Sequence, residues 1–157
     1  MKNELKQELT RRLCACNNGG LVLVMYDIYF GFSDDVKNAL VSEDREALRK
    51  GVSDVQVALD ELMGALDFKY PLAGQLYPLY SYCKRLFSTV LYSLDVSVVD
   101  EADVIMKKLR NSFETAAADD KSAPLMDNAQ KVYAGMTYGR GRLTESFIND
   151  DNRGFLA

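Results

Sequence analysis

The fold is decided by residues 72–94, which read LAGQLYPLYSYCKRLFSTVLYSL. Apolar residues recur in this stretch at steps of mostly four and three, the spacing of one buried stripe on an α-helix. Further apolar side chains lie off the stripe, so the helix is expected to serve a core on one side and a second surface on another. The stripe consists of Leu72, Leu76, Leu79, Cys83, Leu86, Val90 and Leu94, and the additional residues are Tyr77, Tyr80, Tyr82, Phe87, Leu91 and Tyr92.

Three further segments have helical spacing and are expected to form long helices over about residues 20–41, 44–67 and 97–118. Each is expected to place one apolar stripe in a shared core. The second of these segments is the most regular and is otherwise mostly polar. The expected stripes are Leu21, Met25, Ile28, Phe32, Val36 and Leu40; Leu48, Val52, Val55, Leu59, Leu62 and Leu66; and Val98, Ala102, Ile105, Leu109, Phe113 and Ala116.

The residues between these segments are typical of helix ends. Residues 42–44 form a polar turn with capping side chains, and Pro71 suits the first turn of a helix, where its missing N–H would have no partner. Ser97 is expected to cap the last long helix. Four helices joined by short loops, without strand-like alternation of apolar residues, predict an all-α fold, an antiparallel four-helix bundle.

The chain extends beyond the expected bundle domain, residues 17–118, at both ends. Residues 1–16 are expected to form a short helical arm, with Leu5, Leu9 and Leu13 four apart in a stripe suited to lying on a surface. Residues 119–157 lack a sustained stripe and are expected to form a mostly extended tail. Because this tail holds many apolar residues, it is expected to dock on the bundle or on a partner, with a disordered terminus as the alternative.

Composition excludes several classes of function. The chain has 157 residues and a net charge of −4 with both signs interspersed, which predicts one domain and argues against nucleic-acid binding. No apolar run approaches the roughly 20 residues that span a bilayer, so no membrane association is expected. The charged N-terminus lacks the apolar core of a signal peptide, which favours the cytoplasm and free thiols for the three cysteines.

The sequence contains no histidine, which removes the commonest general base and the commonest metal ligand. Cys14 and Cys16 lack the second half of a metal site and are read as small side chains at a helix end. No glycine-rich phosphate loop occurs, and the expected core stripes carry no facing carboxylates. We therefore expect no enzymatic activity, no cofactor and no metal.

Four short segments occur in an order and at a spacing that match one family. They are residues 15–21 with 25–27, residues 42–46, residues 79–87 and residues 109–113. In this order they resemble the first-helix opening, the acidic turn, the tyrosine and arginine segment and the closing segment of the FliS family of flagellar secretion chaperones. The resemblance covers residues 15–113.

This resemblance implies a chaperone without catalytic activity. Such a protein binds the disordered C-terminal segment of flagellin, prevents its premature polymerisation and hands it to the flagellar export gate. The residues themselves favour binding to a segment that folds on its partner, because such a segment needs a long apolar groove to offset its ordering entropy. The apolar residues outside the core stripes are the expected source of that groove.

The expected partner contacts lie on the first and third long helices. Tyr26 is expected either to contact the partner or to pack on a neighbouring helix, and Tyr80 and Tyr82 are expected to divide these two roles. Arg85 is expected to pair either with a partner carboxylate or with an acidic residue of this chain such as Asp27. The full expected set is Leu23, Tyr26, Asp27, Phe30, Tyr77, Tyr80, Tyr82, Arg85, Phe87 and Leu91.

The tail has an expected role of its own. In the FliS family the N-terminal segment caps the groove, whereas residues 1–9 here read MKNELKQEL and are mostly charged. We therefore expect the tail segment 132–138, with Val132, Tyr133, Met136 and Tyr138, to cap the groove when no partner is bound. The alternative to the chaperone is a protein without an export role that forms a homodimer through Tyr77, Tyr80 and Tyr92; the chain is otherwise expected to be a monomer or a weak dimer.

Overall fold

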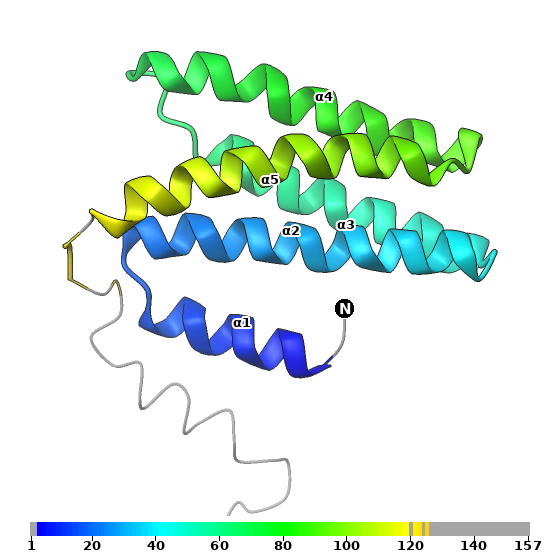
Figure 1. Cartoon of the computed structure of the whole chain (residues 1–157), viewed down its shortest axis with the longest axis horizontal. Helices are drawn as coiled ribbons and strands as arrows, with labels where there is room; N and C mark the ends of the chain where they lie inside the picture. The colour runs from blue at the N-terminus through cyan, green and yellow to red at the C-terminus, as the bar shows by residue number, and fades with distance from the viewer. Residues whose placement is uncertain (1–2, 120, 124, 126–157) are drawn as a thin grey trace, which may run out of the picture. The chain divides into compact units, whose positions relative to one another are not determined.

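The computed structural model describes residues 3–119, 121–123 and 125 (Figure 1). Within these residues the fold is all-helical and contains no strand, which confirms the predicted class. The boundaries agree with the expected segments to within a few residues. The five helices are α1 (Asn3–Ala15), α2 (Asn18–Val41), α3 (Arg45–Gly64), α4 (Pro71–Ser93) and α5 (Val96–Ala118).

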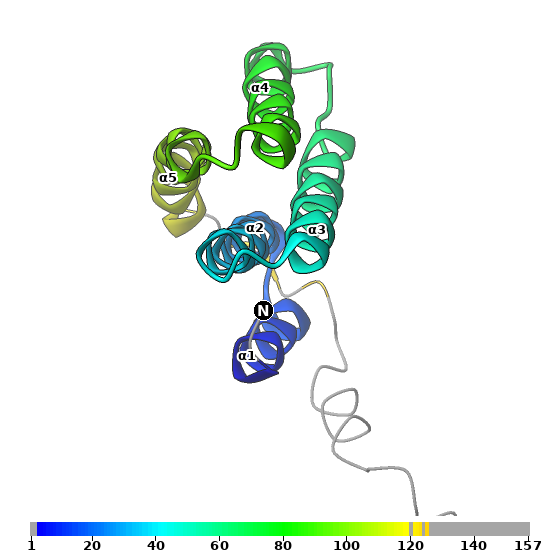
Figure 2. The same ribbon diagram turned by 90° about the vertical axis from the view of Figure 1, so that its right-hand side faces the viewer.

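The four longer helices form a closed ring of contacts. Helix α2 packs against α3 and α5, and α4 packs against the same two helices from the opposite side. Helix α1 lies outside the ring and contacts α2, as the view along the helices shows (Figure 2). A helix in such a ring faces two neighbours, so its buried arc is wider than a single stripe.

Local sequence explains where the helices begin. The Asn17 side chain accepts a hydrogen bond from the Gly20 amide at the start of α2, and the Asp44 side chain accepts from two amides at the start of α3. Helix α4 begins at Pro71, as predicted. The expected Ser97 cap is wrong: Asp95 caps α5 and accepts a hydrogen bond from the Ser97 amide, because a carboxylate two residues earlier already satisfies this N–H group.

The predicted stripe of α3 is confirmed, since five of its six residues are buried and Leu66 is partly buried. In α4 the stripe is right at Leu76, Cys83 and Val90, and Leu86 is partly buried against the core. The buried arc turns toward Tyr80 and Phe87 because α4 must face both α3 and α5. Residues expected in the core that are instead exposed are Leu72, Leu79, Leu94 and Ala116.

A polar network lies along the seam between α2 and α5. The Tyr29 and Ser33 hydroxyls donate hydrogen bonds to Asp103 at 3.0 and 2.8 Å, and Lys37 pairs with Asp103 and Asp100 at 2.7 Å each. Burial disfavours a charged lysine, but the hydrogen bonds that Lys37 donates to both carboxylates outweigh this effect and raise the pKa of Lys37. These contacts hold α5 against one face of α2. Another face of α2 is left to pack against a different neighbour.

Candidate functional site

An apolar groove of about 640 Å³ lies between α2 and α3. The α2 wall is built from large side chains at helical spacing, and the α3 wall from mostly small ones. Glu61 is the one charged residue among those that line it. The lining residues are Leu21, Met25, Ile28, Phe32, Val57, Ala58, Glu61, Gly64 and Ala65.

The large residues of this groove correct the predicted core of α2. The sequence placed Leu21, Met25, Ile28 and Phe32 in the core, whereas the structure leaves them only partly buried at the groove. The fully buried positions of α2 include Val24, Tyr26 and Tyr29, which lie off the predicted stripe, and Val36, which the prediction has right. Helix α2 therefore carries two apolar stripes, and the more regular one faces outward.

The groove is open because the residues on its α3 side leave space unfilled. Val57 is 57% exposed, and a Cβ added at Gly64 would meet no atom within 4 Å. Sequence reasoning missed Val57, Ala58, Gly64 and Ala65 as site residues. Together with Glu61 they fall at three- and four-residue steps on one side of α3, off its regular core stripe and facing the second apolar stripe of α2.

Three residues expected to contact a partner are instead in the core. Tyr26, Tyr80 and Phe87 are each at most 1% exposed. The Tyr26 and Tyr80 hydroxyls are hydrogen-bonded at 2.6 Å, and the Phe87 ring meets the Tyr29 ring edge-on at 5.9 Å. Burial raises the pKa of both hydrogen-bonded tyrosines. These side chains support the bundle. Their contacts within the core leave almost no surface for a partner.

The remaining expected contacts are dispersed. Leu23, Phe30 and Leu91 are partly buried, the last two against the core, and none of them lines the groove. Tyr82 donates a hydrogen bond to Glu101 at 2.5 Å, and Arg85 lies over the Tyr82 ring at 5.7 Å rather than pairing with Asp27. The four tail residues Val132, Tyr133, Met136 and Tyr138 lie outside the described residues.

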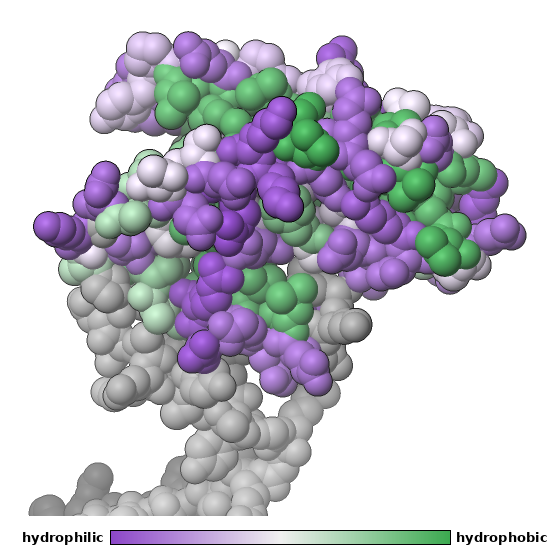
Figure 3. Space-filling view, viewed as in Figure 1, coloured by the Kyte–Doolittle hydropathy of each residue, from purple (hydrophilic) through white to green (hydrophobic). Residues whose placement is uncertain are grey.

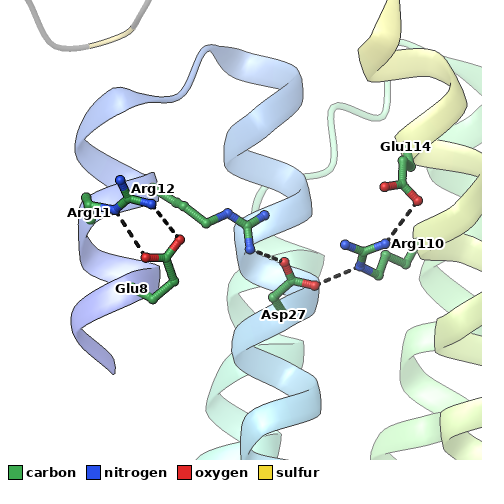
Figure 4. A network of polar contacts seen from close by, with 6 residues as sticks. All are labelled: Glu8, Arg11, Arg12, Asp27, Arg110 and Glu114. Atoms are coloured by element: carbon green, nitrogen blue, oxygen red, sulfur yellow. Dashed lines mark hydrogen bonds and ion pairs between the residues drawn. The ribbon is translucent and has the colours of Figure 1, made fainter. Parts of the chain in front are cut away.

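Asp27 occupies the centre of an ion-pair network that joins three helices (Figure 4). Its two carboxylate oxygens accept from Arg12 of α1 and Arg110 of α5, each at 2.7 Å, and Arg110 also pairs with Glu114. The hydrogen bond that Arg110 donates to Asp27 raises the pKa of Arg110. Both carboxylate oxygens of Asp27 are therefore paired within the chain. Asp27 acts as a clamp that holds α1 against α2, rather than as the expected partner contact.

The tyrosine face proposed for a homodimer is not assembled as expected. Tyr80 is buried, whereas Tyr92 is 87% exposed and Tyr77 packs against Phe68 at the start of α4. Tyr77 and Tyr92 are about 22 Å apart along the helix axis at 1.5 Å per residue. Hydrophobic side chains do reach the surface over α4 in the space-filling view (Figure 3).

Two further features bear on the class of protein. Among the described residues, no group of acidic, cysteine or histidine side chains is arranged to hold a metal ion, and none of the helices has the length and apolar character to cross a membrane. Cys14 and Cys83 are buried free thiols, and Cys16 is a partly buried free thiol. Burial raises the pKa of Cys83 to about 12, which makes it unsuited to act as a nucleophile.

A helical bundle with an open apolar groove on its surface is typical of proteins that bind polypeptide segments. Comparison with protein families then gives the particular class: residues 1–120 match the family FliS, described as flagellar protein FliS, and the chain belongs to this family. FliS proteins are chaperones of flagellum assembly and not enzymes. Among curated protein sequences, none matches the chain.

Proposed function

We propose that this chain is a cytoplasmic export chaperone, built as an antiparallel four-helix bundle, whose α2–α3 groove binds the disordered C-terminal segment of flagellin. Binding keeps the segment from polymerising before export and presents it to the flagellar export apparatus. The observation that carries the proposal is the outward-facing stripe of α2, which supplies Leu21, Met25, Ile28 and Phe32 to a groove that no described part of the chain fills.

The dimensions of the groove suit a short helical or extended segment. Along α2, the distance from Leu21 to Phe32 is about 16 Å, which corresponds to about three turns of a partner helix. An amphipathic helix can lay its apolar face against such a groove with anchors at three- and four-residue steps. Burial of these anchors offsets the cost of ordering a disordered segment.

A pair of matched variants tests the location. Val57 lines the groove and Val104 of α5 does not, yet their exposed fractions are 57% and 54%. We expect Val57→Asp to weaken calorimetric binding of the flagellin C-terminal segment by at least about 1.5 kcal/mol, the loss of one buried valine contact. Val104→Asp should leave binding unchanged. Equal affinities for both variants would place the binding site elsewhere, and no binding by the wild type would refute the proposed function.

A further inference from the structure

A second groove, of about 710 Å³, lies on the surface between α3 and α4. This α3–α4 groove shares no lining residue with the α2–α3 groove, because the two open on different sides of α3. A segment bound in one groove therefore leaves the other open. The residues that line the α3–α4 groove are Asp60, Met63, Tyr77, Pro78, Ser81, Lys84, Arg85 and Ser88.

One end of the α3–α4 groove is aromatic. Phe68, in the loop before α4, meets the Tyr77 ring edge-on at 5.9 Å and is 64% exposed. Tyr70 and Leu72, which follow Phe68 closely in the chain, are 67% and 53% exposed. Large apolar side chains that are exposed together are typical of interaction surfaces.

The other end of the groove carries one unpaired charge. Lys84 and Asp60 are paired with each other, whereas Arg85 is exposed and makes no ion pair with any residue that the structure describes. The Arg85 guanidinium lies over the Tyr82 ring at 5.7 Å, and the hydrogen bond from Tyr82 to Glu101 holds this ring in place. Stacking orients the guanidinium and leaves its N–H groups available for a carboxylate.

Beside the aromatic end, α4 exposes part of its backbone. Pro78 has no N–H to donate to the Gly74 carbonyl, so this carbonyl lacks its regular helical partner. Gly74 is exposed, and a Cβ added there would meet no atom within 4 Å. The backbone of a bound segment can therefore approach α4 closely here and donate a hydrogen bond to this carbonyl.

We propose that the α3–α4 groove is a second docking surface, which binds a segment of a partner protein other than flagellin. The segment carries an apolar side chain, which packs on Phe68 and Tyr77, and a carboxylate, which accepts hydrogen bonds from Arg85. Tyr77 and Arg85 are about 12 Å apart along α4, so the two anchors are about three to four residues apart in an extended segment. A chaperone with two separate grooves can hold its client and contact a second protein at the same time.

The charges favour this partner over a second copy of the chain. In a two-fold symmetric dimer the same surface meets itself. The groove offers Arg85 no unpaired carboxylate, since Asp60 already pairs with Lys84, so self-association would bury two arginines without partners. The neighbouring loop adds one charge of each sign, Asp67 and Lys69, and does not change this balance.

Selection from a displayed library of short random peptides tests the surface on the full-length chain. The library is first depleted on Arg85→Glu, which removes peptides that bind elsewhere, including those that bind the α2–α3 groove. The remaining library is then selected on the wild type. We expect the recovered peptides to combine Asp or Glu with a large apolar residue.

Calorimetry of the recovered peptides then measures the role of Arg85. Arg85→Glu should weaken binding at least about tenfold, because it replaces a charge-assisted hydrogen bond by repulsion. Arg49→Glu is the matched control and should change binding less than about twofold. Arg49 is also exposed, makes no ion pair with a described residue and lines neither groove.

A second pair of variants tests the aromatic end. Tyr77→Ser should weaken binding of the same peptides at least about tenfold, since it removes an aromatic anchor. Tyr92→Ser is its control, because Tyr92 lies on the same helix, is 87% exposed and does not line the groove. Equal binding by Tyr77→Ser and Tyr92→Ser would contradict the proposed position of the apolar anchor.

Other outcomes identify a different occupant or none. If no peptide survives depletion, or if the survivors lack a carboxylate, the proposal is overturned. A dimer in sedimentation that Tyr77→Ser abolishes would assign the groove to a second copy of the chain. Displacement of a recovered peptide by the flagellin C-terminal segment would assign it to flagellin, whereas retention of the peptide supports a second partner. Failure of flagellin to bind at all would refute the proposed function and leave this surface unaffected.

Discussion

The Tyr26 and Tyr80 hydroxyls lie 2.6 Å apart in the centre of the bundle and join α2 to α4. These two helices are diagonal in the ring and do not pack against each other directly, so the two tyrosines bridge them. Both hydroxyls are buried, and each has the other as its partner. The pair is a structural element of the core, although its two members are among the residues that the sequence suggested for partner binding.

Removing one of these hydroxyls should cost more than removing both. Tyr26→Phe leaves the Tyr80 hydroxyl buried without its partner, and we expect the free energy of unfolding to fall by about 1–3 kcal/mol. In Tyr26→Phe with Tyr80→Phe no hydroxyl is stranded, so stability should recover part of this loss. Urea unfolding of the two single variants and the double variant checks the coupling; additive losses would show that the hydrogen bond is not made.

The α2–α5 seam should depend on one carboxylate. Asp103 is 17% exposed in its side chain and accepts from Tyr29, Ser33 and Lys37. Asp103→Ala therefore strands the two buried hydroxyls and removes one of the two carboxylate partners of Lys37. We expect a loss of about 2–3 kcal/mol in the free energy of unfolding. Asp100→Ala is the control because Asp100 is 59% exposed and pairs with the same lysine, and its loss should stay below about 0.5 kcal/mol.

Helix α1 should loosen without the rest of the bundle when Asp27 is neutralised. Asp27→Asn weakens the pair with Arg12, an ion pair that joins α1 to α2. Amide hydrogen exchange should accelerate in α1 and stay unchanged in α3 and α4. Glu8→Gln removes an ion pair within α1 on its exposed side and should leave exchange unchanged; the same acceleration in both variants would contradict the role of Asp27 as a clamp.

Stability should fall on the alkaline side. Burial raises the pKa of the Cys83 thiol from its ordinary value of 9.0 to about 12, so above pH 9 the unfolded chain loses a proton that the folded chain keeps. Each pH unit above 9 should therefore lower the free energy of unfolding by about 1.4 kcal/mol from this group, with the buried tyrosines adding to the decline above pH 10.

Unfolding by urea at pH 7, 9 and 10 measures this decline. Cys83→Ala should show a shallower decline between pH 9 and 10 than the wild type, whatever its stability at pH 7. Because the chain contains no histidine, little change is expected between pH 6 and 8. A wild-type decline that already begins below pH 8 would contradict this assignment.

The sequence predicts some features of this structure well and others poorly. Helical spacing gave the helices and the α3 stripe, because α3 has one apolar face and a polar remainder. It failed on α2, where two apolar stripes coexist and periodicity alone does not say which faces the core. Which stripe of α2 faces the core depends on Tyr29 and Ser33, whose hydroxyls donate hydrogen bonds to Asp103 of α5. Such a long-range pairing has no local sequence signal.

The same limit explains the candidate site. The surplus of apolar residues predicts a second surface on the tyrosines of α4, whereas the groove lies between α2 and α3. Tyrosines are also good core residues when their hydroxyls find partners, as Tyr26 and Tyr80 do. The groove is instead lined mainly by aliphatic residues of α2 and small residues of α3. Helical spacing alone would assign such residues to ordinary core packing.

Site-specific photocrosslinking from the groove tests the central claim most directly. A benzophenone side chain placed at position 57, with position 104 as the matched control, would be irradiated in the presence of the flagellin C-terminal segment. The proposed function predicts a crosslinked one-to-one complex from position 57 and none from position 104. Crosslinks from position 104 alone, or from neither position when calorimetry shows binding, would contradict the assignment of the α2–α3 groove.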